Sequence, residues 1–155
     1  MLKKTMLFFL AFIMLLLLAS CGGQNAASDI SVSDAGLVSG KLRTKADIAS
    51  LVVKTQAKNS DGKSNFTGEM PLPASRTDDN TVTFEFSLFS ALFSAGATLS
   101  YSPFDNILER FLEDKITCEI KADGKVIASF PLDTSNVDEQ KVVEAYQATK
   151  AEEEE

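Results

Sequence analysis

Few residues in this sequence could take part in covalent, acid–base or metal chemistry. The chain of 155 residues contains two cysteines, Cys21 and Cys118, and no histidine. Without histidine it lacks the usual general base at neutral pH and the imidazole ligand of zinc and copper sites. Nucleophiles that depend on a neighbouring histidine are excluded for the same reason. The chemistry that remains is modification of a cysteine, or catalysis by carboxylates alone, as in glycoside hydrolysis.

Cys21 stands at the end of a segment that has the features of an export signal. Lys3 and Lys4 precede thirteen apolar residues at 6–18, MLFFLAFIMLLLL. This run is too short to cross a bilayer, which takes about 20 apolar residues. A positive start, a short apolar core and small residues after it are typical of a secretory signal peptide. We expect that signal peptide to occupy residues 1–20.

The four residues Leu18-Ala19-Ser20-Cys21 resemble the lipobox of bacterial lipoproteins: an aliphatic residue, two small residues and a cysteine. The resemblance implies that the Cys21 thiol is alkylated with diacylglycerol, that the leader is cleaved before it, and that the new amino terminus is acylated. Two acyl chains anchor a protein stably where one does not. The resemblance implies residence in the bacterial cell envelope, with the membrane as a partner through the lipid at Cys21. Gly22 follows the cysteine where aspartate would signal retention, which favours the outer membrane if the organism has one.

The composition of the remaining chain limits its partners. Cleavage before Cys21 would remove two lysines and no acidic residue, leaving 135 residues and changing the formal net charge from −7 to −9. That length fits one domain. A net acidic chain lacks the basic footprint of a nucleic-acid-binding protein and gains no overall attraction to anionic lipid. The sequence therefore predicts no nucleic-acid partner and an anchor that has to be covalent.

Alternation of apolar and polar residues recurs along the chain and indicates β-strands. The clearest segment is 81–88, TVTFEFSL, in which the valine, both phenylalanines and the leucine share one face. Segments 37–42, 48–57 and 66–72 are further candidates, and the prolines at 71 and 73 suit an edge strand. We predict a mainly β domain, β-sandwich-like or α+β, with five to seven antiparallel strands and one or two short helices.

Residues 116–132, ITCEIKADGKVIASFPL, are typical of a β-hairpin that turns at Asp123-Gly124. A two-residue loop would pair charged residues with apolar ones, whereas a three-residue loop at 122–124 pairs apolar residues only. Those pairs are Ile120 with Val126, Cys118 with Ala128, and Ile116 with Phe130. Because the buried face fixes the register, we predict the longer loop, with Gly124 left-handed in a bulge. Cys118 is then a buried small hydrophobe rather than a reactive thiol.

The rest of the chain suggests helices and two polar ends. Ser102, Pro103 and an apolar stripe predict a helix at 103–113, and a second helix is expected at 136–150 with Asn136 and Glu139 forming its cap. Small and polar residues at 21–36 predict a flexible tether, and the glutamate run at 151–155 predicts a solvated acidic tail. The single β-rich domain would then span 37–150.

The segment 86–104, FSLFSALFSAGATLSYSPF, is uncharged over nineteen residues. One interpretation is that it belongs to the core, packed over the sheet. The other is that it forms an apolar groove or patch for a lipid, a peptide or a partner protein. The candidate residues for such apolar binding are Phe86, Phe89, Phe93 and Tyr101.

The acidic residues offer little sign of catalysis or metal binding. Glu109, Glu113 and Asp114 fall on or beside the solvated face of the expected helix, and Asp78-Asp79 lie in a turn. No pair stands in an apolar setting that would separate two pKa values, so we predict no catalytic site, no metal and no cofactor.

The sequence thus predicts a cell-envelope lipoprotein that acts as a noncatalytic binding or structural module. Its partner would be an envelope protein or an apolar ligand. One alternative is a carrier of an apolar ligand, which predicts an enclosed cavity lined by Phe84, Phe86, Phe89 and Phe93. The other is a small hydrolase that uses carboxylates alone, which predicts two facing carboxylates in a cleft.

Overall fold

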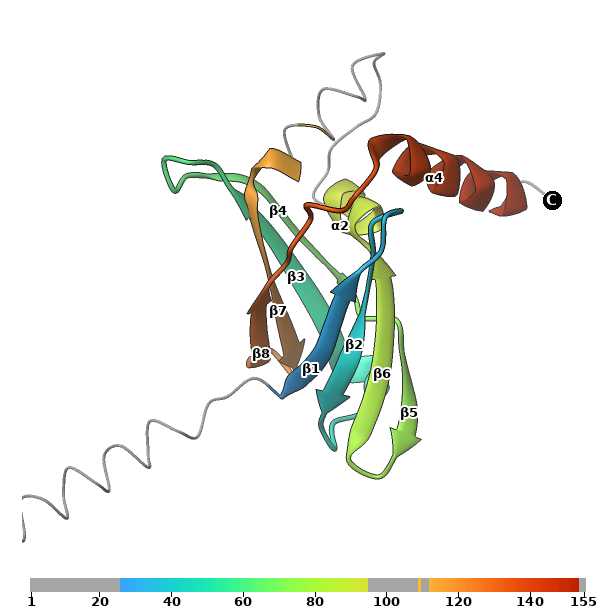
Figure 1. Cartoon of the computed structure of the whole chain (residues 1–155). Helices are drawn as coiled ribbons and strands as arrows, with labels where there is room; N and C mark the ends of the chain where they lie inside the picture. Colours follow the sequence, from blue (N-terminus) through green and yellow to red (C-terminus); the bar gives the residue numbers. More distant parts are fainter. Residues whose placement is uncertain (1–25, 95–108, 110–111, 154–155) are drawn as a thin grey trace, which may run out of the picture.

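Two four-stranded antiparallel sheets face each other in the computed structural model, which describes residues 26–94, 109 and 112–153 (Figure 1). The first sheet has the order β1-β2-β6-β5, and its strands are β1 (Ala27–Val32), β2 (Leu37–Arg43), β6 (Thr81–Ser87) and β5 (Ala74–Asp78). The second has the order β4-β3-β7-β8, and its strands are β4 (Ser64–Pro71), β3 (Leu51–Lys58), β7 (Lys115–Ala122) and β8 (Lys125–Pro131). The predicted mainly β, sandwich-like class is confirmed.

Helices occupy the ends of the sandwich. A short 3-10 helix, η1 (Ile48–Ser50), precedes β3 within the segment predicted to be strand from residue 48. The helices α2 (Leu88–Ser94) and α4 (Glu139–Glu153) lie together at the opposite end from the β5–β6 turn (Figure 1). Most of the predicted helix at 103–113 lies outside the described residues.

The described strands form four hairpins that alternate between the two sheets. Hairpins β1–β2 and β5–β6 build the first sheet, and hairpins β3–β4 and β7–β8 build the second. In each sheet one strand of each hairpin meets at the centre. The central pairs have an uninterrupted register, from Leu37 opposite Ser87 in β2–β6 and from Leu51 opposite Ala122 in β3–β7. The described residues form eight strands, whereas the sequence predicted five to seven. The two strands that were not predicted are β1 and β5.

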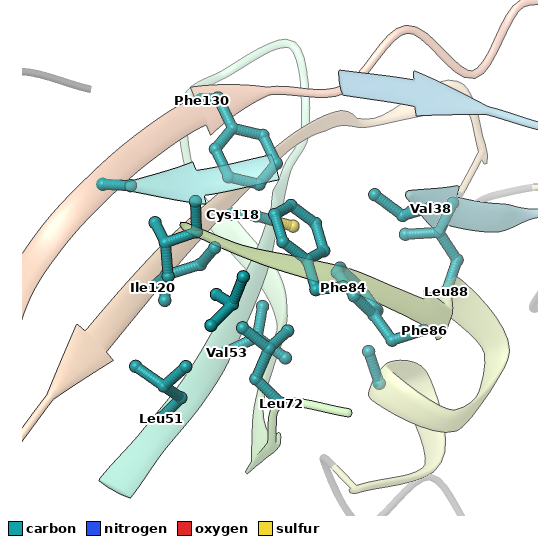
Figure 2. Close-up of a cluster of buried hydrophobic side chains, with 14 of the residues drawn as sticks. Val38, Leu51, Val53, Leu72, Phe84, Phe86, Leu88, Cys118, Ile120 and Phe130 are labelled. Atoms are coloured by element: carbon teal, nitrogen blue, oxygen red, sulfur yellow. The ribbon is translucent and has the colours of Figure 1, made fainter. Parts of the chain in front are cut away.

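Alternating side chains from both sheets meet in one core (Figure 2). On β6 the predicted apolar face, Val82, Phe84 and Phe86, is buried. The ring of Phe84 lies 6.3 Å from the ring of Phe86 and 6.3 Å from that of Phe130 on the other sheet, measured between centroids. It also covers Gly40, where a Cβ atom would come within 2.7 Å of the Phe84 ring. This arrangement lets an aromatic ring fill the space that a glycine leaves in a central strand.

A proline-flanked corner carries the chain from one sheet to the other. The backbone N–H of Leu72 donates to the Leu51 carbonyl at 2.9 Å in the second sheet. One residue later, the Pro73 carbonyl accepts from the N–H of Glu85 at 3.2 Å in the first. Pro71 and Pro73 have no N–H to leave unpaired here, which is why prolines are tolerated at strand edges. Pro71 lies in the edge strand β4, as predicted, and Pro73 lies just beyond the end of that strand.

Each of the four edge strands has a bulge, at which it contains one extra residue relative to the facing segment of the central strand. The register shifts lie between Ser28 and Ser31 in β1, opposite Ala57 and Lys58 in β4, between Arg76 and Asp78 in β5, and opposite Ile120 and Lys121 in β8. Such bulges twist an edge strand and disfavour pairing with another chain. The bulges therefore protect the exposed edges of both sheets.

The turn of the β7–β8 hairpin differs from the prediction. Asp123 and Gly124 have φ angles of 50° and 77°, and Ala122 pairs directly with Lys125. Positive φ at both central residues is what a two-residue type I′ turn requires. The predicted three-residue loop is therefore wrong, although Gly124 is left-handed as expected.

The bulge in β8 explains why the predicted apolar face is buried except at Val126, and why the predicted pairs are wrong. The short turn places Val126 on the outer face, and one extra residue brings Ala128 and Phe130 back to the buried face. Ala128 then pairs with Ile120 and Phe130 with Cys118. Cys118 is fully buried, as predicted.

The predicted ends of the domain need two corrections. The tether prediction for 21–36 is wrong from Ala27 onward, because β1 pairs with β2 and its Ile30 and Val32 pack against the core. Residues 22–26 separate Cys21 from the first strand. At the other end, α4 continues through Glu153, three residues into the predicted acidic tail.

Candidate binding groove and attachment point

The structure separates the residues that were proposed to form one apolar binding region. Phe86 belongs to the core between the sheets, whereas Phe89 belongs to a second cluster beneath α4. Both are about 3% exposed. Phe93 is a residue of α2, but its side chain lies outside the description, as do Tyr101 and Cys21. The two described members therefore do not line a common cavity.

The second cluster joins α2 to α4. The rings of Phe89 and Tyr146 are 4.6 Å apart between centroids and tilted by 48°. Val142 is the other buried member, and its Cγ2 atom would lie 3.3 Å from a Cβ atom at Gly36. Gly36 has φ of 76°, so glycine satisfies both the turn and the close approach of α4.

Polar contacts hold α4 to the β1–β2 turn. Lys141 forms an ion pair with Asp34, whose pKa is lowered mainly by that hydrogen bond. The N–H of Asp138 donates to the Asp34 carbonyl at 2.8 Å. The Asp138 carboxylate caps α4 by accepting from the N–H of Gln140 at 2.9 Å, whereas Asn136 donates instead to the Val32 carbonyl at 2.9 Å. The prediction that Asn136 caps this helix is wrong, because α4 begins at Glu139.

Cys118 lies opposite Thr55 in the central pair of the second sheet. Burial raises the pKa of its thiol to about 11, against the opposing effect of a 3.5 Å contact between Sγ and the Thr55 hydroxyl. A thiol is reactive as the thiolate, so this environment keeps Cys118 inert at neutral pH. Thr55 is the buried polar residue of this region, and Cys118 satisfies its hydroxyl.

A shallow groove of about 750 Å³ crosses the outer face of the β1-β2-β6-β5 sheet. It forms because small side chains meet on neighbouring strands while longer charged ones stand at its rim. The residues that line it are Asp29, Ser39, Gly40, Lys41, Pro73, Ala74, Ser75, Thr83, Phe84 and Glu85. This groove was not predicted from the sequence. The alternation of small hydroxyl residues with core residues on β2 and β6 was the signal that could have indicated it.

The polar groups of the groove are preorganised by contacts with one another. Asp29 and Lys41 form an ion pair at 2.8 Å, and the hydrogen bond and charge of Asp29 raise the pKa of Lys41. Asp29 reaches this position from a left-handed backbone with φ of 54°, within the β1 bulge. The hydroxyls of Ser31 and Ser39 lie 2.9 Å apart at its border. The groove therefore presents hydroxyls and carboxylates on a rigid sheet, with nearly balanced charge.

A second hollow of about 800 Å³ lies at the β5–β6 turn, and its lining runs over 43–45 and 78–81. Arg76 donates to the Thr44 carbonyl at 3.0 Å and also to the Ala46 carbonyl. The N–H of Asn80 donates to Asp78 at 2.8 Å and lowers the pKa of that carboxyl. These contacts are those of a polar turn, so this hollow is explained by local structure.

Comparisons with known proteins and a search for metal-binding side chains do not identify a function for this chain. No protein-family model matches the chain, and neither curated proteins nor solved structures include a significant match. Within the described ranges, no group of three or more histidine, cysteine, aspartate or glutamate side chains is placed to hold a metal ion. None of the helices that the structure describes is long and apolar enough to cross a membrane.

Proposed function

We propose that this protein is a lipid-anchored, noncatalytic binding module of the bacterial cell envelope. The observation that carries the proposal is the short distance in sequence between the lipobox cysteine and a rigid sandwich: β1 begins at Ala27, six residues after Cys21. A thioether-linked diacylglycerol at Cys21 would supply the two acyl chains that stable anchoring requires. The anchor would then hold the sandwich beside the membrane and present its outer faces to the envelope.

The acidic groups of the described chain support a noncatalytic role. The carboxyls whose pKa values depart from the ordinary one, Asp34, Asp78 and Asp133, all have lowered values, because each accepts hydrogen bonds. A general acid built from a carboxyl needs the opposite change, which burial in an apolar wall provides. Their environment is therefore that of turns and caps rather than of a hydrolase.

We assign the groove on the β1-β2-β6-β5 sheet to the ligand, and we propose that this ligand is a polysaccharide chain with little net charge. The backbone of β2 and β6 is fully engaged in their ladder, so a ligand on this face has to be recognised by side chains. Hydroxyls such as those of Ser39 and Thr83 both donate and accept, as sugar hydroxyls do. Asp29 and Glu85 add acceptors, and the apolar surface of the groove, to which Pro73 and Ala74 contribute, is about as extensive as its polar surface and can contact the carbon-bound faces of sugar rings.

The anchor is tested by the intact mass of the protein purified from membranes of its native host. We expect a chain that begins at Cys21 and carries diacylglycerol on sulfur together with an amino-terminal acyl group. A free thiol at position 21 with the leader still attached would contradict the proposal. The variant Cys21→Ser is the control, because it should remain unprocessed.

The groove is tested with polysaccharide released from the host's own envelope, by affinity electrophoresis. The variant Ser39→Trp should fill the groove and abolish the retardation of the protein band. Thr117→Trp is the matched control, because Thr117 is exposed on the outer face of the other sheet and should bind as the wild type does. Equal retardation of both variants would remove the groove from the proposal and leave the anchor standing.

A further inference from the structure

We infer that one corner of the sandwich, formed by Lys121, Lys125 and Val126, rests on the headgroups of the membrane that holds the lipid anchor. This inference depends on the proposed lipidation of Cys21. It adds an orientation: the end of the domain that carries the β7–β8 turn faces the membrane. The helices α2 and α4 face away from it.

Val126 is unusually exposed for its type. It is 52% exposed, the larger value of the two exposed large hydrophobic side chains in the described part of the chain. The cause is the two-residue turn, which places Val126 opposite Lys121 on the outer face before the bulge restores the buried pattern. A single exposed apolar residue is ordinary on a protein surface. Its position and its neighbours make this one informative.

The corner lies where the chain leads back to the anchor. Strand β8 runs beside β1, and β1 begins at the same end of the sandwich as the β7–β8 turn (Figure 1). The carbonyl of Ala26 accepts from the N–H of Arg43 at 2.7 Å, so Ala26, one residue before β1, is already bonded to the end of β2. Val126 and the point where the tether joins β1 therefore lie at the same end of the sandwich.

The length of the tether then restricts the orientation. Six residue steps separate Cys21 from Ala27, which is roughly 20 Å at full extension. The sulfur of a lipidated cysteine stays at the membrane surface with its acyl chains in the bilayer. The start of β1 cannot move further from the headgroups than this, and the nearby corner is kept at a high effective concentration against them.

The chemistry of the corner suits an anionic interface. Lys125 is exposed, and Lys121 stands opposite Val126, with its ammonium in an ion pair with Glu69 of β4 at 2.7 Å. Lysines beside an apolar residue can place their ammonium groups among headgroup phosphates while the apolar residue enters the interface. Glu69 and Asp123 oppose this attraction, so the contact is weak and depends on the anchor. The net negative charge of the whole chain does not prevent it, because screening confines the attraction to nearby groups.

The test uses the lipidated full chain in vesicles of phosphatidylcholine and phosphatidylglycerol at a ratio of about 7:3, a composition chosen for its anionic surface potential. A nitroxide label is attached to Val126→Cys and, as the matched control, to Gln140→Cys at the exposed start of α4. The buried Cys118 should not react, and the sulfur of a lipidated Cys21 is blocked. Collisions with a water-soluble nickel chelate should be lost at 126 and retained at 140. The added charge reversal Lys125→Glu should restore them at 126.

Different results would contradict the lipid anchor and the proposed orientation of the domain. The mass of the same sample reports whether Cys21 carries lipid. A lipidated protein whose label at 126 remains as accessible to the chelate as the label at 140 would overturn the orientation and leave the anchor intact. A sample that binds vesicles with no lipid on Cys21 would overturn the anchor, and the restricted tether with it.

Discussion

Two apolar clusters hold this molecule together, and they differ in how they are built. Among the described residues, the core between the sheets contains seventeen buried ones, which come from strands of both sheets, from Leu72 at the corner between β4 and β5, and from α2. The cluster beneath α4 has two, Phe89 and Val142, with partly buried neighbours around them. Because local opening costs less where less apolar surface is buried, we expect α4 to detach without unfolding of the sandwich. The stability of the sandwich therefore depends on the first cluster, and the second cluster stabilises only the docking of α4.

The largest effect should come from removing the ring at the centre of the core. Phe84→Ala removes the contacts with Phe86 and Phe130 and uncovers Gly40. We expect a loss of about 3–5 kcal/mol in the free energy of unfolding, measured by guanidinium denaturation followed by far-UV circular dichroism. Val126→Ala is the matched control, because truncation of an exposed side chain should change stability by less than about 0.5 kcal/mol.

A smaller effect should come from adding one methyl group beneath the same ring. Gly40→Ala places a Cβ atom within 2.7 Å of both the Ile30 Cδ1 atom and the Phe84 ring. The Ile30 terminus can rotate, whereas the ring of Phe84 is held by its neighbours. Overpacking should cost about 1–3 kcal/mol, reduced by the lower chain entropy of the unfolded alanine variant.

A double-mutant cycle sharpens that prediction. In a Phe84→Leu background the added methyl group should cost less, since the ring is no longer there to be displaced. Equal costs of Gly40→Ala in the two backgrounds would show that Phe84 does not fill the space above the glycine. Ser39→Ala, one residue away on the outer face, should have little effect in either background.

Sequence patterns located the central strands better than the edges. The alternation at 81–88 identified β6 and its buried face, because a central strand has to present one apolar row to the core. Strand β1 was mistaken for a tether, because ASDISV is polar and its bulge breaks the period of two. The turn of the last hairpin was missed for the same physical reason: side-chain alternation determines which residues are buried, but an extra bulge residue changes their partners.

Candidate functional residues could likewise be predicted where they are neighbours in the sequence, but not where the fold brings them together. The resemblance to a lipobox is visible in four neighbouring residues, because such a motif is local in sequence. The alternation on β2 and β6 could indicate an outer face of small hydroxyl residues, but it could not locate the groove, since Asp29, Ser39 and Ser75 come from three strands whose order was unknown. The proposed apolar region was divided because Phe86 lies in β6 and Phe89 lies in α2, just after the chain changes from strand to helix, and the two residues belong to different clusters.

The cluster beneath α4 should respond locally. Val142→Ala removes two methyl groups from a buried site and should weaken the docking of α4 by about 2 kcal/mol. We expect faster amide hydrogen exchange along α4 and an unchanged rate in the central pairs β2–β6 and β3–β7. An equal increase in the exchange rates of α4 and of the central strand pairs would mean that the two clusters unfold as one unit.

The smallest effect should come from the ion pair that holds α4 to the β1–β2 turn. Lys141 lowers the pKa of Asp34 below its ordinary value of 3.8, so the pair stabilises docking above that pH, and the contribution is lost as the pH falls through the lowered value. Both side chains are exposed, so the effect should appear in α4 alone. Asp34→Asn should lower the protection factors of the α4 amides, which are corrected for the intrinsic pH dependence of exchange, at pH 6, and it should abolish their further fall on acidification toward pH 3. Asp61→Asn, in an exposed turn at the β3–β4 end, should retain that fall. Its loss there as well would assign the pH dependence to another carboxyl.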